Sequence, residues 1–197
     1  MSKKSAALIF LVLASVSNLH SQKLSLHAGT GIFRPAGNAV RSLYGNSIPL
    51  VLDVGYRLGR KFGLAAGLEW RRDRGVALPI GPGTEEFPVR LRMVSVPVSA
   101  FAEFSGELGR FPFVIDLGAG ISWNSYKETW DRVALSHSGT DWGYRLYATA
   151  DFRPFPRIGF FAQVRWDTVP TGRESILDEN INLGGVGLLA GLSLYLF

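Results

Sequence analysis

The feature of this sequence that most restricts its fold is a two-residue alternation of apolar and polar side chains, which recurs from residue 23 to the C-terminus. In 158–167, for example, Ile158, Phe160 and Val164 share one parity, whereas Gln163 and Arg165 share the other. This period places alternate side chains on opposite faces of a β-strand. The sequence therefore predicts eight strands, near residues 24–32, 50–59, 62–71, 94–104, 113–123, 142–153, 158–167 and 186–196.

The two faces of these strands differ in kind. The apolar face carries no charged residue in any of the eight segments, and the opposite face mixes glycines with ionised side chains. A water-soluble barrel of this width would have to bury large apolar side chains from every strand, which overfills its interior. The reverse arrangement suits a bilayer, since lipid contacts the apolar face and a closed barrel pairs every backbone amide. We expect an all-β, eight-stranded, antiparallel, up-and-down transmembrane barrel.

The charged residues of the inward parity lead to a second prediction. A buried ion without a partner costs several kcal/mol, so we expect these acids and arginines to form a structural network rather than pairs of catalytic carboxylates. An eight-stranded interior is filled by side chains, and no wide aqueous pore is expected. The predicted network comprises Asp53, Arg57, Glu69, Arg71, Glu103, Asp116, Arg145, Asp151, Arg153, Arg165 and Asp167.

The lengths of the predicted connections alternate between long and short. Long segments are expected near 33–47, 72–88, 125–140 and 168–182, and short turns near residue 60 and in 105–111 and 154–157. Outer-membrane barrels have long external loops and short periplasmic turns. Four tryptophans lie at strand ends that meet the long loops, and we interpret them as an aromatic belt at one membrane interface: Trp70, Trp123, Trp142 and Trp166.

The N-terminus has the three parts of a cleavable export signal. Lys3 and Lys4 precede an apolar stretch over 6–16, and small and polar residues follow over 17–22. We expect cleavage after Ser21, which leaves residues 22–197 as the barrel domain. Because residues 1–21 contain two of the 21 basic residues and no acid, cleavage lowers the formal net charge from +5 to +3.

Composition excludes several functional classes. The chain has no cysteine, which rules out disulfides, thiolate metal sites and a cysteine nucleophile. The three histidines are dispersed and no phosphate-binding glycine loop occurs, so we expect no metal or other cofactor. A charge of +3 without a basic cluster typical of nucleic-acid binding argues against a nucleic-acid partner.

Taken together, the strand pattern, the loops and the terminal Leu194-Tyr195-Leu196-Phe197 resemble the small eight-stranded outer-membrane barrels, such as the OmpA transmembrane domain. The resemblance covers residues 23–197 and depends on the pattern rather than on a specific motif. It implies localisation in the outer membrane and recognition of Phe197 by the outer-membrane assembly machinery. In that family the terminal Phe shares the lipid-facing parity, whereas here Leu188, Leu192 and Leu196 form the more apolar set. A bulge in the last strand would reconcile the two.

Four arginines continue the lipid-facing parity beyond the predicted belt. Arg72 and Arg74 follow Trp70, and Arg90 and Arg92 precede Val94 on the next strand. The planar guanidinium group binds two phosphate oxygens at once. Contact with the anionic headgroups of lipopolysaccharide is one hypothesis; solvated charges that mark the membrane boundary are the other.

Two local features remain. Ser136-His137-Ser138 raises the possibility of a lipid A deacylase, because some small outer-membrane barrels use a Ser/His pair. Neighbours on a strand face opposite sides, however, and a polar loop cluster is the preferred interpretation. His27 is expected to be a hydrogen-bonded interior group. Pro97 removes a backbone donor from the middle of a strand, which predicts a local bulge.

The sequence thus predicts a non-catalytic outer-membrane barrel that acts structurally or binds through its long loops. An envelope lipid-modifying enzyme is the first alternative, and a soluble lipocalin-like carrier is the second.

Overall fold

The computed structural model describes residues 24–59, 61–77, 87–108, 111–131, 135–155, 157–171 and 181–196. The predicted signal peptide and Phe197 lie outside this part of the chain. The described residues form eight strands and one short helix: β1 (Leu24–Pro35), α2 (Asn38–Tyr44), β2 (Leu50–Arg57), β3 (Phe62–Ala77), β4 (Phe87–Leu108), β5 (Phe111–Trp130), β6 (Leu135–Phe152), β7 (Ile158–Thr168) and β8 (Gly185–Leu196).

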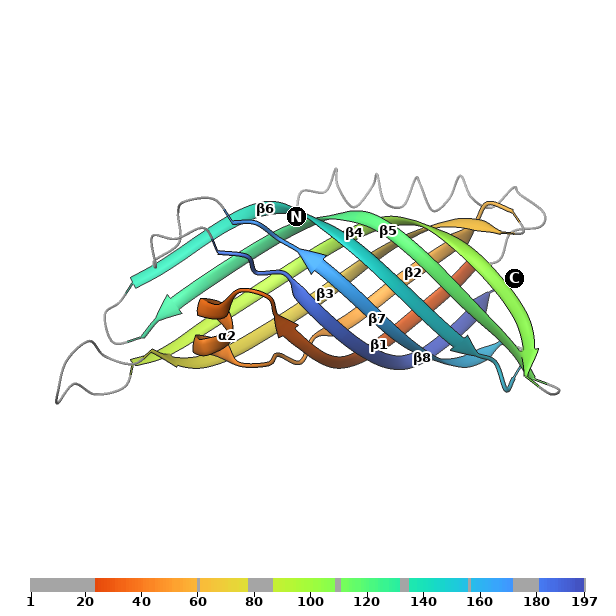
Figure 1. The fold of residues 1–197 in the computed structure, drawn as a ribbon, viewed down its shortest axis with the longest axis horizontal. Helices are drawn as coiled ribbons and strands as arrows, with labels where there is room; N and C mark the ends of the chain where they lie inside the picture. Colours follow the sequence, from red (N-terminus) through yellow and green to blue (C-terminus); the bar gives the residue numbers. More distant parts are fainter. Residues whose placement is uncertain are drawn as a thin grey trace.

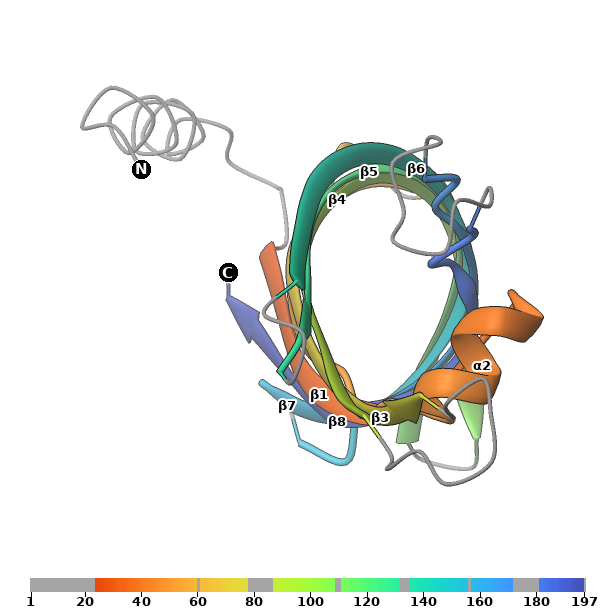
Figure 2. The same ribbon diagram turned by 90° about the vertical axis from the view of Figure 1, so that its left-hand side faces the viewer.

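Each strand pairs with the next along the chain, and β8 pairs with β1 to close the ring (Figures 1 and 2). All eight pairings are antiparallel, so the predicted up-and-down barrel is confirmed. Leu24 lies opposite Leu196, which brings the two described ends of the chain together. They lie at the end of the barrel away from α2, which we call the terminal end; the other is the α2 end (Figure 1). In the described residues no helix is long and apolar enough to cross a membrane.

The side chains face as the alternation predicts. Leu64, Leu146 and Val164 point outward with 47%, 51% and 55% of their surface exposed. Arg165, which precedes Trp166 in β7, points inward and retains 1%. In water such an exposed apolar surface around a whole barrel would be unfavourable, and it excludes the lipocalin-like alternative, whose large apolar side chains would line the interior.

Two predicted bulges are absent. The last strand keeps one register with β1 from Leu24↔Leu196 to Pro35↔Gly185, and its even-numbered residues face outward throughout. At Pro97 the register with β3 is the same before and after the proline. Pairing with β3 lapses only opposite Gly67 and Leu68, so the missing N–H interrupts the ladder without inserting a residue.

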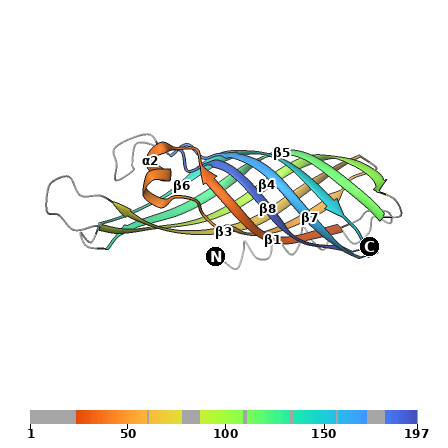
Figure 3. The same cartoon turned by 60° about the horizontal axis from the view of Figure 1, so that its bottom comes forward.

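Four strands extend far beyond their predicted bounds, and β1 extends slightly beyond its own, to Pro35. β3 to β6 continue past the tryptophan positions into segments expected to be loops, and they reach farther toward the α2 end than β1, β7 and β8 do (Figures 1 and 3). Pairing between β4 and β5 extends to Val89↔Trp130, whereas pairing between β6 and β7 starts only at Tyr144↔Thr168. The α2 end of the barrel is therefore higher on one side.

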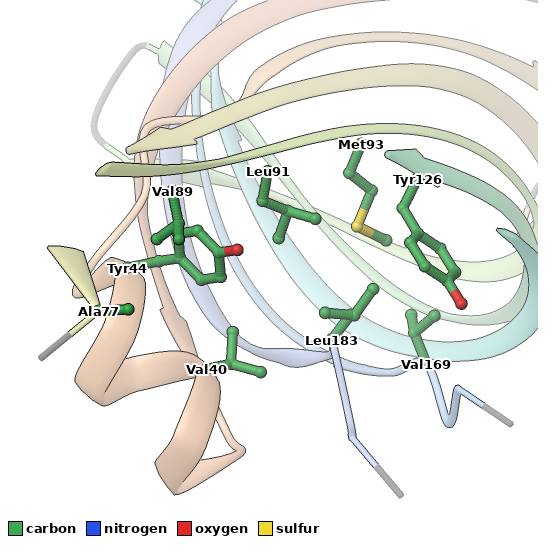
Figure 4. Packing of buried hydrophobic residues seen from close by; sticks show 9 residues of the cluster. All are labelled: Val40, Tyr44, Ala77, Val89, Leu91, Met93, Tyr126, Val169 and Leu183. Carbon is green, nitrogen blue, oxygen red and sulfur yellow. The ribbon is translucent and has the colours of Figure 1, made fainter. Parts of the chain in front are cut away.

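The alternation inverts in this extension. Outside the extension, apolar side chains of β4 such as Val94 face outward. Within the extension, Leu91 and Met93 face inward and are 3% and 5% exposed. Val40 and Tyr44 of α2 pack against them, together with Leu183 and other buried residues (Figure 4). Arg90 and Arg92 occupy the outward positions here. The extension is thus built like a water-exposed barrel, with an apolar interior and a charged exterior.

Candidate functional site

A group of four charged side chains crosses the middle of the barrel. Glu69 of β3 accepts hydrogen bonds from Arg145 of β6 at 2.7 Å and from Arg165 of β7 at 2.5 Å. Asp167 of β7 contacts the same two arginines, at 2.6 Å to Arg145 Nε and 3.1 Å to Arg165 Nε. All four side chains are buried. We call Glu69, Arg145, Arg165 and Asp167 the central ionic group.

A second pair extends this group toward the α2 end. Arg71 contacts Asp73 at 3.0 Å and donates hydrogen bonds to the carbonyl of Leu183 at 3.3 and 3.4 Å. Its guanidinium carbon also lies 4.5 Å from the centre of the Phe33 ring. A cation held by a carboxylate, a carbonyl and an aromatic face is well compensated for its burial.

The terminal end holds a third polar group, centred on Asp151. This carboxylate is 3.2 Å from His27 Nε2 and accepts hydrogen bonds from Ser193 at 3.0 Å and Tyr195 at 2.5 Å. Arg153 stacks on the Tyr195 ring, with its guanidinium carbon 3.6 Å from the centre of the ring. Arg57, the last residue of β2, forms an ion pair with Glu103 of β4 toward the same end of the barrel. His27 therefore faces the interior as expected and contacts Asp151, but among the described residues its Nε2 makes no hydrogen bond.

Asp53 and Asp116 face the interior without a salt bridge in the described residues. They line a cavity of about 30 Å³, together with Pro97, Tyr147 and other side chains. A space of this size holds one or two water molecules. Close packing accounts for the small volume, since a Cβ on Gly67 would lie 1.9 Å from the Asp53 carboxylate and one on Gly118 would lie 2.2 Å from the Tyr147 ring.

Helix α2 is joined to the barrel wall by a buried hydrogen bond. Tyr44 donates its hydroxyl to Glu128 of β5 at 2.6 Å. Burial raises the pKa of the Tyr44 hydroxyl well above its usual value, and the Glu128 carboxylate raises this pKa further. Tyr126 and His137 stack beside this bond with their ring centres 6.0 Å apart. Together with the apolar cluster of Figure 4, this contact holds α2 over the inner wall of β4.

The four arginines of the outer surface lie together. Arg72 pairs in register with Arg92, and Arg74 with Arg90. On the other side of β4, Lys127 lies opposite Arg92 and Thr129 opposite Arg90. All four arginines are exposed, and Arg90 forms an ion pair with Asp131. The Arg72 guanidinium lies over Trp70, 4.0 Å from the centre of the ring.

The four belt tryptophans face outward, as the alternation predicts. Their exposed fractions are 40% for Trp70, 39% for Trp123, 63% for Trp142 and 47% for Trp166. Trp123 lies directly opposite Trp142 across the β5–β6 ladder. The fifth tryptophan in the chain, Trp130, belongs instead to the inner cluster at the α2 end.

Ser136, His137 and Ser138 form part of β6 rather than a loop. Ser136 and Ser138 are exposed on the outer face, while the His137 ring faces inward against Tyr126. Because the hydroxyls and the imidazole lie on opposite sides of the sheet, they do not form a nucleophile and base pair.

Several residues of these sites were not anticipated from the sequence. Tyr44 was missed because α2 has only seven residues, too few for a helical period to be evident. Glu128 was missed because its segment of β5 was expected to be a loop. Lys127 and Thr129 were missed because their segment was assigned to a loop. A detectable signal was present, since the apolar Val89, Leu91 and Met93 alternate with Arg90 and Arg92.

The architecture is shared with solved structures of outer-membrane proteins. OprG from Pseudomonas aeruginosa matches with a TM-score of 0.59 at 11% identity, over 88% of this chain and 95% of that chain. A major outer membrane protein from Thermus thermophilus gives 0.56 at 13% identity, over 90% and 100%. Neisserial surface protein A gives 0.54 at 16% identity, over 88% and 94%.

No protein-family profile matches the sequence, and no curated protein sequence does so either. At these low identities the structural matches establish the fold and nothing further. They agree with the closed ring of eight antiparallel strands described above. The chain has the fold of the small eight-stranded outer-membrane β-barrels.

Proposed function

We propose that this protein is a non-catalytic barrel of the bacterial outer membrane, closed to solutes, which presents the extension of β3 to β6 at the cell surface. Residues 1–21 serve as its export signal, and the α2 end faces outward. The orientation is supported by connection lengths, since the tight turns between β2 and β3 and between β6 and β7 lie at the terminal end. Phe197 is proposed to be the contact for the outer-membrane assembly machinery.

The observation that carries this proposal is the filled interior. The central ionic group spans the lumen from β3 to β6 and β7, and the cluster around Leu91, Val40 and Leu183 fills the lumen at the α2 end. Between the central group and the terminal end, the cavity of about 30 Å³ has no room for a continuous water column. Such an interior stabilises the barrel and blocks the diffusion of solutes through its lumen.

Conductance in planar lipid bilayers tests closure directly. The purified barrel is expected to give no stable channel, and the variant Glu69→Ala/Asp167→Ala, which removes both acids of the central group, is expected to give leak currents if it folds. The control Glu107→Ala changes an exposed acid at the terminal end and is expected to remain silent. Large, stable channels from the unaltered protein would contradict the proposal.

The enzymatic alternative is tested separately. Lipid A acyl content is expected to be the same in cells with and without the protein, because the Ser136 and Ser138 hydroxyls lie on the opposite face of β6 from His137. Loss of an acyl chain that depends on the protein and disappears in Ser136→Ala/Ser138→Ala would favour the enzyme.

A further inference from the structure

We infer that the outer faces of β3, β4 and β5 form a binding site for phosphate groups of an outer-leaflet lipid, with lipopolysaccharide as its occupant. The inference depends on the proposed orientation in the outer membrane. The site consists of two neighbouring rows of the sheet: Arg72, Arg92 and Lys127 in one row, and Arg74, Arg90 and Thr129 in the other. We call these six residues the basic grid.

Among the described residues, the grid concentrates positive charge around a single acidic partner. Directly opposite residues in an antiparallel sheet bring their Cβ atoms within about 5.5 Å, and like charges at such positions are destabilising. Arg72 lies opposite Arg92, and Arg92 lies opposite Lys127. Only Arg90 has a carboxylate partner within the described residues, namely Asp131. An anion bound between the rows would relieve the repulsion that the fold otherwise leaves in place.

The grid also contains a hollow of suitable size. Arg90, Arg92, Lys127 and Thr129 line a depression of about 150 Å³ on the outer wall. Arg90, Arg92 and Lys127 can only donate hydrogen bonds, and the Thr129 hydroxyl can both donate and accept them. A phosphate group, with several acceptor oxygens and negative charge, matches this lining.

The height of the grid relative to the apolar band selects a lipid as the source of the phosphate. Arg72 is two residues beyond Trp70, a rise of about 7 Å along the strand and of ~5 Å along the membrane normal at the usual tilt. Belt tryptophans lie at the level of the headgroups. Below the grid, Val94 and Val96 are 37% and 38% exposed on the same wall and offer a surface for acyl chains.

Stacking further fixes part of the grid. The Arg72 guanidinium lies 4.0 Å above the Trp70 ring, which orients its remaining donors along the wall. On the far side of Lys127, Ser138 lies opposite it in register, and Ser136 lies opposite Thr129. These outward hydroxyls extend both rows onto β6 and are suited to bind sugar or phosphate oxygens. They give the exposed serines a role that needs no catalysis.

The test measures how much lipopolysaccharide the detergent-purified barrel binds, by native mass spectrometry. The variant Arg92→Gln/Lys127→Gln removes two cations of the hollow. The matched control Arg34→Gln/Lys61→Gln removes two exposed cations outside the grid, one on β1 and one beside β3. We expect roughly tenfold weaker binding, or more, for the grid variant and unchanged binding for the control. Equal binding by both variants would overturn the inference.

Further arms separate the sources of the anion. Dephosphorylated lipopolysaccharide and phosphatidylethanolamine are expected to bind weakly, and excess inorganic phosphate is expected to compete poorly because it lacks acyl chains. Efficient displacement by inorganic phosphate, or binding of a sulfated polysaccharide but not of lipopolysaccharide, would overturn the choice of a lipid. Folding of each variant is checked by its heat-dependent gel migration. Closure to solutes is measured in a separate experiment, as conductance in planar bilayers. A leaky barrel with intact lipid binding would therefore contradict the proposed function but not the lipid site.

Discussion

Glu69 of β3 and Arg165 of β7 form an ion pair at 2.5 Å although their strands stand four places apart in a ring of eight. The pair therefore joins opposite walls of the barrel across its full width. Arg145 and Asp167 complete the contact from β6 and β7. Backbone ladders connect only neighbouring strands, and this cross-connection adds a tie that the ladders cannot supply.

Replacement of Glu69 by glutamine is expected to lower the free energy of unfolding by about 3 kcal/mol, since it leaves two buried arginines to share Asp167. Urea titration of the barrel in lipid vesicles, followed by tryptophan fluorescence, gives the difference. Glu107→Gln, an exposed acid, provides the comparison and should leave the midpoint within error. Identical midpoints for the two variants would mean that the ionic group does not stabilise the barrel.

The Tyr44–Glu128 hydrogen bond predicts a specific dependence on pH. Because burial raises the pKa of Tyr44 in the folded protein, its contribution to stability is complete below the pKa of an unfolded tyrosine, about 10, and declines as the pH rises above that value. The unaltered protein should therefore lose more stability between about pH 9 and pH 11 than Tyr44→Phe does, as measured by urea titration at each pH. Tyr144→Phe removes a hydroxyl from an outward ring that is 63% exposed and should behave like the unaltered protein. Parallel pH curves for Tyr44→Phe and the unaltered protein would exclude the effect.

The change of environment along the strands predicts unequal costs for the same truncation. Leu91→Ala in the inner cluster leaves a cavity and should lower the free energy of unfolding by about 2–5 kcal/mol. Leu188→Ala, at a position 59% exposed on the outer wall, should cost less because lipid chains fill the space. Both values come from the same urea titration. A larger loss at Leu188 would contradict the assignment of the two surfaces.

The tryptophan belt predicts a common depth in the membrane. Four variants, each keeping one of Trp70, Trp123, Trp142 and Trp166 and carrying phenylalanine at the other tryptophan positions, should be quenched alike by lipids brominated near the headgroup. A variant that keeps only Trp130 should be quenched little, since this side chain belongs to the inner cluster. Strongly different quenching among the four belt variants would remove the evidence for an interface at their level.

Much of this architecture follows from alternation because a two-residue period assigns every side chain to a face once one face is known to meet lipid. That argument predicted the eight strands and the inward direction of the Arg145 and Arg165 side chains. It did not predict that Pro97 would leave the register intact, because the sequence shows the missing donor but not the neighbouring strands that hold the alignment. Pairing of Glu69 with Arg165 also depends on the closed ring, which brings residues 96 positions apart into contact.

The extension of β3 to β6 escaped the sequence argument for a related reason. There the charged residues move to the outer parity, as in Arg72 and Arg92, and the apolar residues move inward, as in Met93. A rule derived from the lipid-facing part interprets this inversion as the end of the strand. The hydrogen-bonded ladder continues across it, because backbone pairing does not depend on which solvent the side chains meet.

The unequal strand lengths make the two sides of the α2 end different. In the proposed orientation, β3 to β6 project from the membrane on one side of the barrel, whereas β7 and β8 end near the membrane surface. A molecule diffusing within the leaflet thus meets a different profile from each side. The rotation of the barrel about its own axis therefore determines which side, tall or short, it presents to a neighbouring molecule in the membrane.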